Sequence, residues 1–481
     1  MATNVEFDLV IRGGRIVTAA DSYVADVGVR GERIAAIGCD LGRGREEIDA
    51  RGKWVLPGGI DAHCHIDQPS SDGTVCADDF RTGTIAAACG GTTTIIPFAV
   101  QAKGQGLAVA VRDYHERAAG KAVIDYAFHL IVSDPTHEVL ERELPQLIRD
   151  GYTSFKIYMT YDDLKLNDRQ ILDVLALSRR ERALVMVHAE NSDVIAWLTE
   201  QLEKAGKTAP RYHGVSRPPA VEREATHRAI SLSEIVGVPI LIVHVAGKDA
   251  VEQIQWAQAR GLPIYAETCP QYLFLTADDL ARPGFEGAKC LCSPPPRDKA
   301  SQEAIWMGLR SGLFDVFSSD HAPTRYQDPL GKMIHGKDAA FRYIPNGVPG
   351  IETRLPLLFS AGVIGGRIDP ETFVALTSTN PARVYGLYPR KGTLAIGSDA
   401  DIAIWDPQRQ VIIENEKLHH AVDYTPYEGM SVTGWPVITV SRGAIVWRDG
   451  QFLGVPGRGA FLRCGTPEPA LKDAYAGSLG E

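Results

Sequence analysis

Eight β-rich runs, each followed by a segment with helical spacing of apolar residues, occupy residues 58–387 and constrain the fold more than any other feature. The helical segments include LAVAVRDYHERAAG and DAVEQIQWAQARG. Strands that alternate with such helices form parallel sheets, and eight units can close into a barrel. We therefore predict an α/β protein with a (β/α)8, TIM-like barrel. The predicted strands are 58–66, 92–98, 125–133, 152–159, 184–190, 239–247, 262–269 and 314–322.

The sequence pattern at both ends of the chain differs from the strand and helix alternation of residues 58–387. Apolar and polar positions alternate between Gly-rich turns at the start, and the pattern returns near the end in KGTLAIGSDADIAIWDP and ITVSRGAIVWRDGQFL. We predict that residues 1–57 and 388–455 pair into a small β-sandwich domain beside the barrel. Residues 456–481 are expected to form a tail along the chain's own surface or against a neighbouring subunit.

Charge and hydropathy limit the partners. The 481-residue chain has a formal net charge of −10, whereas a nucleic-acid surface needs a concentrated excess of Lys and Arg. The start, MATNVEFDLVIRGG, lacks the basic and apolar blocks of a signal peptide, and the longest apolar stretch, near VGVPILIVHVAG, is too short to span a bilayer. We expect a cytoplasmic protein without nucleic-acid or membrane partners. The eight irregularly spaced cysteines are expected to be reduced thiols.

The first predicted strand carries two histidines in the stretch LPGGIDAHCHID. Residues two apart on a strand point to the same face, with Cα atoms about 6.5 Å apart, so His63 and His65 could share a metal ion. Cys64 points to the opposite face and is a poor candidate ligand. Two hydrogen-bonded core histidines would give the same pattern, so this stretch alone does not establish a metal site.

Further candidate ligands lie near the ends of four other predicted strands. They are Lys156, His188, His244 and Asp320. Each has a structural alternative: a core histidine bonded to a carbonyl, an aspartate that caps a helix, or a lysine that extends to solvent. Functional side chains of such barrels gather at the carboxyl ends of the strands, so we expect these residues to converge with the two histidines into a metal site.

Lys156 is the unusual member of this set. Lysine is rarely buried without a partner, and its neighbours Phe155 and Ile157 are apolar. A cationic ammonium would repel metal ions. A carbamate formed from the neutral amine and CO₂ would instead be an anion with two oxygens, which can bridge two ions about 3.5–4 Å apart. We therefore expect a carbamylated Lys156.

Motifs along most of the chain, in order from residue 8 to 460, resemble the amidohydrolase superfamily and its dihydropyrimidinase and hydantoinase branch. These are cyclic amidases that open six- and five-membered ureide rings. The matching stretches are GGIDAHCHID, VCADDFRTGT, GGTTT, SFKIYMTY, VHAEN, RPPAVEREATHRAI, HVAG, AETCPQYL, CSPPPRDK, SSDHAP, IPNGVPGIE, NPARVYGLYPRKGTLAIGSDADIAIWDP and SRGAIVWRDG.

The resemblance implies two divalent metal ions per subunit, usually zinc, and a homo-oligomer, either a dimer or a tetramer. One ion would be held by His63, His65, carbamylated Lys156 and Asp320, and the other by Lys156, His188 and His244.

The resemblance also implies roles in catalysis and substrate binding. Asp320 would move the proton to the leaving ring nitrogen, and Tyr161 would stabilise the oxyanion. Backbone groups of Ser293 and Asn346 would hold the ureide edge of the substrate. Without the resemblance, Tyr161 is equally consistent with an aromatic residue packed on the rim, and Ser293 and Asn346 are ordinary turn residues.

The implied function is hydrolytic ring opening of dihydrouracil and dihydrothymine, and of hydantoins, to N-carbamoyl amino acids, as in pyrimidine catabolism. Alternatives are a D-hydantoinase for aryl hydantoins, an allantoinase, and a non-catalytic protein like the collapsin response mediators, which lack the metal ligands. All six ligand positions are filled here, which favours the enzyme.

Two departures from relatives bear on substrate choice. The loop DQPSSDGTV is polar where relatives often have apolar side chains, and Pro97 stands where an Asp is common. Polar residues offer little apolar area to an aryl group, so we predict a preference for small dihydropyrimidines. Met159 and Phe98 are the residues that could supply an apolar wall instead.

Overall fold

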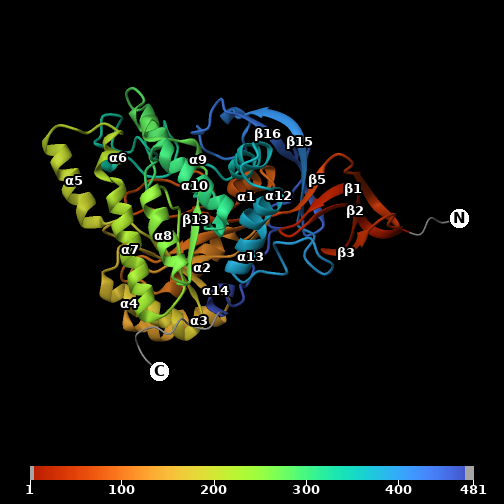
Figure 1. Ribbon diagram of the computed structural model, residues 1–481, viewed down its shortest axis with the longest axis horizontal. Helices are drawn as coiled ribbons and strands as arrows, with labels where there is room; N and C mark the ends of the chain where they lie inside the picture. Colours follow the sequence, from red (N-terminus) through yellow and green to blue (C-terminus); the bar gives the residue numbers. More distant parts are fainter. Residues whose placement is uncertain (1–4, 472–481) are drawn as a thin grey trace.

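The computed structural model describes residues 5–471, in which a closed parallel barrel lies beside a second, mostly antiparallel sheet (Figure 1). The barrel strands are ordered β6-β7-β9-β10-β11-β12-β13-β14, with β8 also paired to β7. Their bounds are β6 Gly59–Cys64, β7 Thr92–Val100, β8 Asp125–Tyr126, β9 His129–Ile131, β10 Ser154–Tyr158, β11 Leu184–His188, β12 Ile240–Ile242, β13 Ile264–Thr268 and β14 Val316–Phe317. The (β/α)8 barrel predicted from the strand and helix alternation is confirmed.

The barrel closes between its first strand and the segment that follows β14. The backbone N–H of Asp320 donates to the carbonyl of His63 at 2.9 Å, and the N–H of His65 donates to the carbonyl of His321 at 2.7 Å. Cys64 and His321 form a parallel bridge at the same place. The seam of the barrel therefore brings His63 of β6, and His65 directly after β6, to the aspartate that follows β14.

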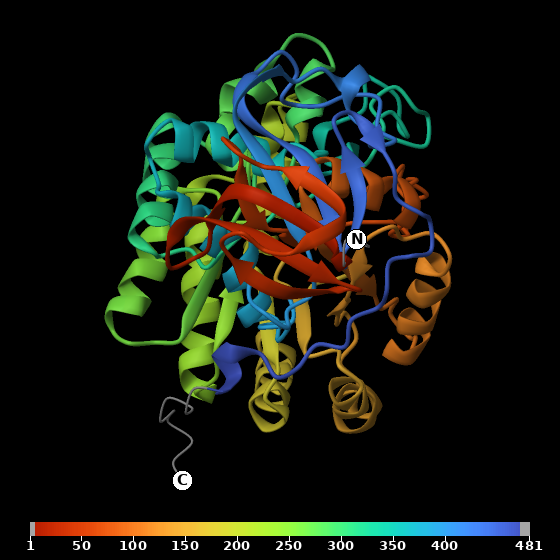
Figure 2. The ribbon, with the colours of Figure 1, turned by 90° about the vertical axis from the view of Figure 1, so that its right-hand side faces the viewer.

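Helices surround the barrel (Figures 1 and 2). The α-helices are α1 Phe80–Cys89, α2 Leu107–Ala118, α3 Leu144–Arg149, α4 Asp168–Glu181, α5 Ser192–Lys204, α6 Tyr212–Ser216, α7 Pro219–Val236, α8 Lys248–Ala259, α9 Gln271–Phe274, α10 Lys299–Ser311, α11 Arg354–Leu358, α12 Pro370–Val374, α13 Asn380–Val384 and α14 Glu468–Leu471. Shorter turns are the π-helices η1 Val139–Glu143, η5 Phe359–Ile364 and η6 Ala375–Thr379, and the 3₁₀-helices η2 Ala277–Ala281, η3 Glu286–Cys290, η4 Phe341–Tyr343 and η7 Asn415–Lys417. α2 and α8 occupy the two helical segments singled out in the sequence.

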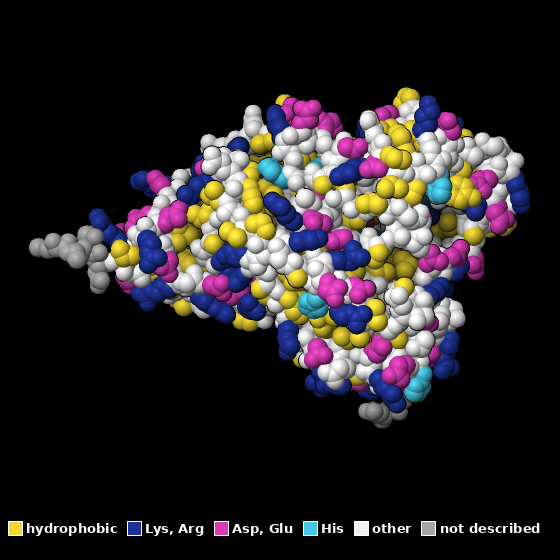
Figure 3. Space-filling model, turned by 180° about the vertical axis from the view of Figure 1, so that it is seen from behind, with side chains coloured by type: hydrophobic (Ala, Val, Ile, Leu, Met, Phe, Trp, Pro, Cys, Tyr) yellow, Lys and Arg dark blue, Asp and Glu magenta, His cyan; other side chains and the backbone are white. Residues whose placement is uncertain are grey.

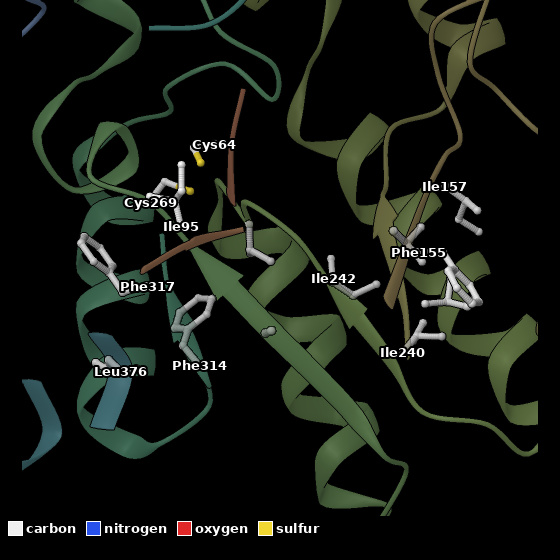
Figure 4. Packing of buried hydrophobic residues seen from close by; sticks show 14 of the residues in the cluster. Cys64, Ile95, Phe155, Ile157, Ile240, Ile242, Cys269, Phe314, Phe317 and Leu376 are labelled. Carbon is white, nitrogen blue, oxygen red and sulfur yellow. The ribbon is translucent and has the colours of Figure 1, made fainter. Parts of the chain in front are cut away.

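Alternation along β10 separates the core from the site. Phe155 and Ile157 belong to the large apolar cluster between the strands and the helices, where Figure 4 shows them near Ile240 and Ile242 of β12. Lys156, between them, points into the barrel. Because successive side chains of a strand face opposite ways, the burial of its two neighbours fixes the inward direction of this lysine.

The observed strand bounds differ from the predicted ones by a few residues, and three predicted strands differ most. The run 125–133 is divided into β8 and β9, which pair with different parts of β7. The runs 239–247 and 314–322 contain shorter strands that end at Ile242 and Phe317. His244 and Asp320 follow these ends with φ angles of 39° and 50°, a left-handed conformation that cannot continue a strand.

The second sheet combines strands from both ends of the chain (Figure 2), in the order β18-β17-β16-β15-β5-β1-β2-β3, with β4 paired to β1. β5 pairs antiparallel with β15, and Trp54 lies opposite Trp405. The bounds are β1 Val5–Val17, β2 Ser22–Arg30, β3 Arg33–Gly38, β4 Arg43–Asp49, β5 Trp54–Pro57, β15 Ile402–Ile412, β16 Ser431–Ser441, β17 Ala444–Arg448 and β18 Gln451–Phe452. The predicted β-sandwich beside the barrel is thus present.

The described part of the C-terminal tail lies along its own barrel. The N–H of Tyr126 donates to the carbonyl of Ala460 at 3.0 Å, and the N–H of Leu462 donates to the carbonyl of Tyr126 at 2.7 Å. Phe461 packs against the rings of His115 and Tyr152. Residues 472–481 lie outside the described residues, and the tail's contact with another subunit stays a prediction.

The face drawn in Figure 3 has basic and acidic side chains interspersed among apolar ones. Within residues 5–471, no helix is long and apolar enough to cross a membrane. All eight cysteines are free thiols.

Candidate active site

A pocket of about 480 Å³ opens at the carboxyl ends of the barrel strands. Eight of the nine residues singled out in the sequence line it, namely His65, Lys156, Tyr161, His188, His244, Ser293, Asp320 and Asn346. The ninth, His63, is fully buried, and its Nε2 lies 2.8 Å from Nζ of Lys156. The structure therefore brings all nine residues to one place.

Two histidines and one aspartate form the tightest group of candidate ligands. Nε2 of His63 and Nε2 of His65 each lie 3.3 Å from Oδ1 of Asp320. The available ligand atoms of the three residues all lie within 4.8 Å of one another. The histidines lower the pKa of the Asp320 carboxyl, although burial opposes that shift, so this carboxylate stays ionised. The group can hold a metal ion.

Three histidines have one ring nitrogen tied to a side-chain oxygen. Nδ1 of His63 lies 2.6 Å from Oε1 of Glu267, and Nδ1 of His65 lies 2.6 Å from Oε1 of Gln68. Nε2 of His188 lies 2.8 Å from Oε2 of Glu190. A hydrogen bond of this kind fixes the tautomer and leaves the other ring nitrogen free to bind a metal.

The rings of His188 and His244 pack against one another in the pocket. Their ring centroids are 4.4 Å apart at an angle of 75°. Burial lowers the pKa of both imidazoles, which favours the neutral form that binds metals. Nδ1 of His244 is buried without a hydrogen-bond partner among the described residues. Because buried polar atoms are nearly always paired, this orphaned nitrogen fits a ligand that binds there.

Lys156 is buried among these candidate ligands. Its side chain is 1% exposed, and its Nζ lies 4.5 Å and 4.9 Å from the ring centroids of Phe98 and Tyr158. Burial lowers the pKa of Lys156, because the charged ammonium is poorly solvated there. A larger share of the side chain is therefore the neutral amine, the form that can react with CO₂.

Tyr161 packs against the imidazole of His188. Its ring centroid is 5.4 Å from that of His188, and its backbone has a φ of 68°, which is uncommon for a bulky residue. Burial raises the pKa of the phenol, so the hydroxyl keeps its proton and can donate a hydrogen bond. The left-handed backbone turns the chain shortly after β10, and the Tyr161 ring lines the pocket.

Ser293 and Asn346 lie side by side in the pocket. Oγ of Ser293 lies 3.4 Å from Oδ1 of Asn346 and 3.2 Å from Nε2 of His213. The segment that carries Asn346 is fixed from behind, because Nζ of buried Lys332 donates to the carbonyls of Pro345 at 2.8 Å and of Gly347 at 2.9 Å. These two sequence-predicted residues are therefore neighbours on one wall.

Residues that support the site were not identified from the sequence. Glu267 lies near the end of β13, in AETC, and Glu190 follows β11, in VHAE, and these positions were the available signal. Nη1 of Arg217 lies 3.2 Å from Nδ1 of His213, and Nε of Arg217 lies 3.7 Å from Oε1 of Glu190. The i, i+4 spacing to His213 was a possible signal, whereas the contact with Glu190 joins two separate segments that no spacing rule relates.

Met159 and Phe98, the apolar residues considered from the sequence, do not line the pocket. Met159 belongs to the apolar cluster between the barrel and the helices. Phe98 packs against the rings of His63 and His65. Among the described residues, the pocket is lined instead by Leu164, Tyr343 and Ile344. The polar residues Gln68, Ser70, Asp72 and Thr74 of the first loop also line it.

The family profile described as "Amidohydrolase family" matches residues 54–446. The chain is 46% identical to a D-hydantoinase of Rhizobium radiobacter, over 95% of this chain and 98% of that protein, and 48% identical to a D-hydantoinase of Geobacillus stearothermophilus, over 94% and 96%. The crystal structure of dihydropyrimidinase from Brevibacillus agri NCHU1002 superposes with a TM-score of 0.92 at 46% identity, over 95% of this chain and 98% of that one. The chain belongs to the amidohydrolase family.

Proposed function

We propose that this protein is a metal-dependent cyclic amidase that opens hydantoins and dihydropyrimidines by hydrolysis to N-carbamoyl amino acids. The observation that carries the proposal is the convergence of four histidines, one buried lysine and one aspartate around a single pocket. The D-hydantoinase and dihydropyrimidinase relatives, alike over nearly their whole length, support the choice of substrate class.

The ligand set fits two divalent cations, with zinc as the expected metal. His63, His65 and Asp320 would hold one, His188 and His244 the other, and a carbamate on Lys156 would serve both. When bound, such ions polarise a carbonyl and lower the pKa of water. The orientation of three of the histidines by Glu267, Gln68 and Glu190, and the unpaired Nδ1 of His244, support this assignment.

Asp320 is the proposed proton carrier. Its Oδ1 faces the two histidines of the first strand, and Nε2 of Gln271 lies 3.4 Å from its Oδ2. A carboxylate at this position can accept the proton of the attacking water and deliver it to the ring nitrogen that leaves. The low pKa of this group makes it the ionised acceptor that the first transfer requires.

Tyr161, Ser293 and Asn346 are the proposed substrate contacts. The protonated hydroxyl of Tyr161 can donate to the oxygen of the ring carbonyl as negative charge develops there. Backbone groups of Ser293 and Asn346 can hold the ureide edge, and their neighbouring positions on one wall support that role.

The proposal also covers the location, the assembly and the domains of the protein. We infer a cytoplasmic homo-oligomer, a dimer or a tetramer, with a small cyclic ureide as its substrate. Residues 58–387 would be the catalytic barrel, residues 1–57 with 388–455 the small β domain, and residues 456–481 a tail that can contact another subunit.

A substrate panel with metal analysis of the same preparation tests the proposal. Dihydrouracil, dihydrothymine, hydantoin, aryl hydantoins and allantoin would be assayed with the parent protein and with Asp320→Asn. We expect ring opening of hydantoins and dihydropyrimidines by the parent and its loss in the variant. Turnover of none of these compounds by metal-loaded protein would overturn the proposal, and turnover of allantoin alone would reassign the substrate.

A further inference from the structure

A second group of metal-ligating side chains lies outside the active-site pocket. It consists of Cys89 at the end of α1, Glu352 shortly before α11, and His419 in the connection between β15 and β16. One available ligand atom from each residue lies within 4.8 Å of the other two. None of the three lines the pocket.

Two of these side chains are already paired. Oε1 of Glu352 lies 2.9 Å from Nδ1 of His419, and Oε2 accepts the backbone N–H of His419 at 2.7 Å. The carboxylate is 4% exposed and Cys89 is fully buried, whereas the side chain of His419 is 32% exposed. The imidazole therefore lies between the buried pair of ligands and solvent, where an ion can enter.

The ligand types suit a borderline-soft divalent cation. Thiolate sulfur, imidazole nitrogen and carboxylate oxygen are the three protein ligands of zinc. Around a tetrahedral zinc ion such atoms lie about 3.4–3.6 Å apart, as follows from bond lengths of about 2.0–2.3 Å. Nδ1 of His419 and Oε1 of Glu352 would separate by roughly half an ångström from their present contact, and the thiol would rotate toward them.

The exchange of protons for the ion leaves the charge of the group unchanged. A thiol, a carboxylate and an imidazolium together are neutral. When a divalent cation enters, the thiol of Cys89 loses one proton and the Nδ1 of His419 loses another, so thiolate, carboxylate, neutral imidazole and cation are again neutral. The large cost of burying a net charge is therefore avoided.

We propose that Cys89, Glu352 and His419 form a binding site for Zn²⁺ or Cd²⁺, distinct from the active site, with water completing the coordination. The ion would tie the end of α1 to the segment before α11 and to the β15–β16 connection. Thr439 of β16 already contacts this end of α1, since its Oγ1 donates to the carbonyl of Ala88 at 2.8 Å. Binding should therefore stabilise the contact between the barrel and the second sheet.

Cadmium titration of the metal-loaded protein tests this site, because the ligands proposed for the active site include no thiolate. We expect one Cd²⁺ per subunit with an ultraviolet thiolate-to-metal charge-transfer band, and a rise in Tm on binding. Cys89→Ser, a swap of nearly equal size, should abolish the band, weaken binding at least tenfold and leave ring opening unchanged. His419→Asn should also weaken binding.

Two cysteine variants serve as matched controls. Cys39→Ser removes an exposed thiol and Cys76→Ser removes one that lines the active-site pocket, and both should keep the band. Absence of the band in the parent protein, its persistence in Cys89→Ser, or its loss in either control variant would overturn the proposal.

Discussion

Nε2 of His63 lies 2.8 Å from Nζ of Lys156, and both side chains are almost completely removed from solvent. The two residues come from strands β6 and β10, which are separated by β7 and β9 in the sheet. An imidazole and an amine held this close, with the ionised Asp320 3.3 Å from the same imidazole nitrogen, form a compact polar centre inside the barrel. The predictions for Lys156, Tyr161 and Glu267 depend on this centre.

Replacement of Lys156 by alanine should remove the proposed bridge between the metals. We expect Lys156→Ala to lose both bound metal and ring-opening activity. Short carboxylic acids added to this variant should restore part of each, because they can occupy the space of the carbamate. Metal analysis and turnover are measured together, with the partly exposed Lys121→Ala as the control. A Lys156→Ala protein with the parent rate would show that this lysine is only structural.

Tyr161→Phe removes one hydroxyl from the lining of the pocket. Loss of a single oxyanion donor should lower kcat by roughly 10²–10³. The metals should be retained, because the phenol belongs to neither proposed ligand set. Steady-state kinetics and metal content of the purified variant check this. An unchanged kcat would assign Tyr161 to packing on the rim.

Glu267 contacts two proposed ligands: its Oε1 accepts the backbone N–H of His244 at 3.2 Å and lies 2.6 Å from Nδ1 of the His63 imidazole. Glu267→Ala frees that imidazole to rotate, so we expect metal affinity to fall by about 10–100-fold. Competition with a chelator measures the affinity independently of turnover. The exposed Glu303→Ala should behave like the parent protein, and equal affinities for all three proteins would rule out the supporting role of Glu267.

The pocket wall predicts the substrate preference. Gln68, Ser70 and Asp72 present polar groups, and burial of such groups against an aryl ring costs free energy. We predict a higher kcat/KM for dihydrouracil than for phenylhydantoin. Leu164 and Tyr343 offer the opposing apolar surface. A preference of tenfold or more for phenylhydantoin, about 1.4 kcal/mol, would show that this apolar surface dominates.

Regular periodicity made most of the fold predictable. The strand and helix alternation predicted the barrel, and the same pattern placed His63, Lys156 and His188 correctly at strand ends or within strands. The extents of two strands were wrong at His244 and Asp320, because local left-handed turns end the strands early and leave no simple signal in the sequence.

The interactions that orient the active-site residues were harder to predict from the sequence. Glu267 contacts His63, and Arg217 contacts Glu190, each from a separate segment of the chain, and such contacts depend on side-chain packing rather than on spacing. Met159 was considered as a wall of the pocket because it directly follows the Lys156 strand. The structure turns it outward, since the side chains of consecutive residues alternate between the two faces of the barrel.

Metal dependence tests the central claim most directly. Metal content and the rates of hydantoin and dihydrouracil opening should be measured on one preparation before chelation, after chelation, and after addition of zinc, manganese or cobalt. We predict about two divalent ions per subunit, loss of both activities with the metal, and their recovery on reconstitution. A metal-free preparation that opens either ring at the full rate would contradict this prediction.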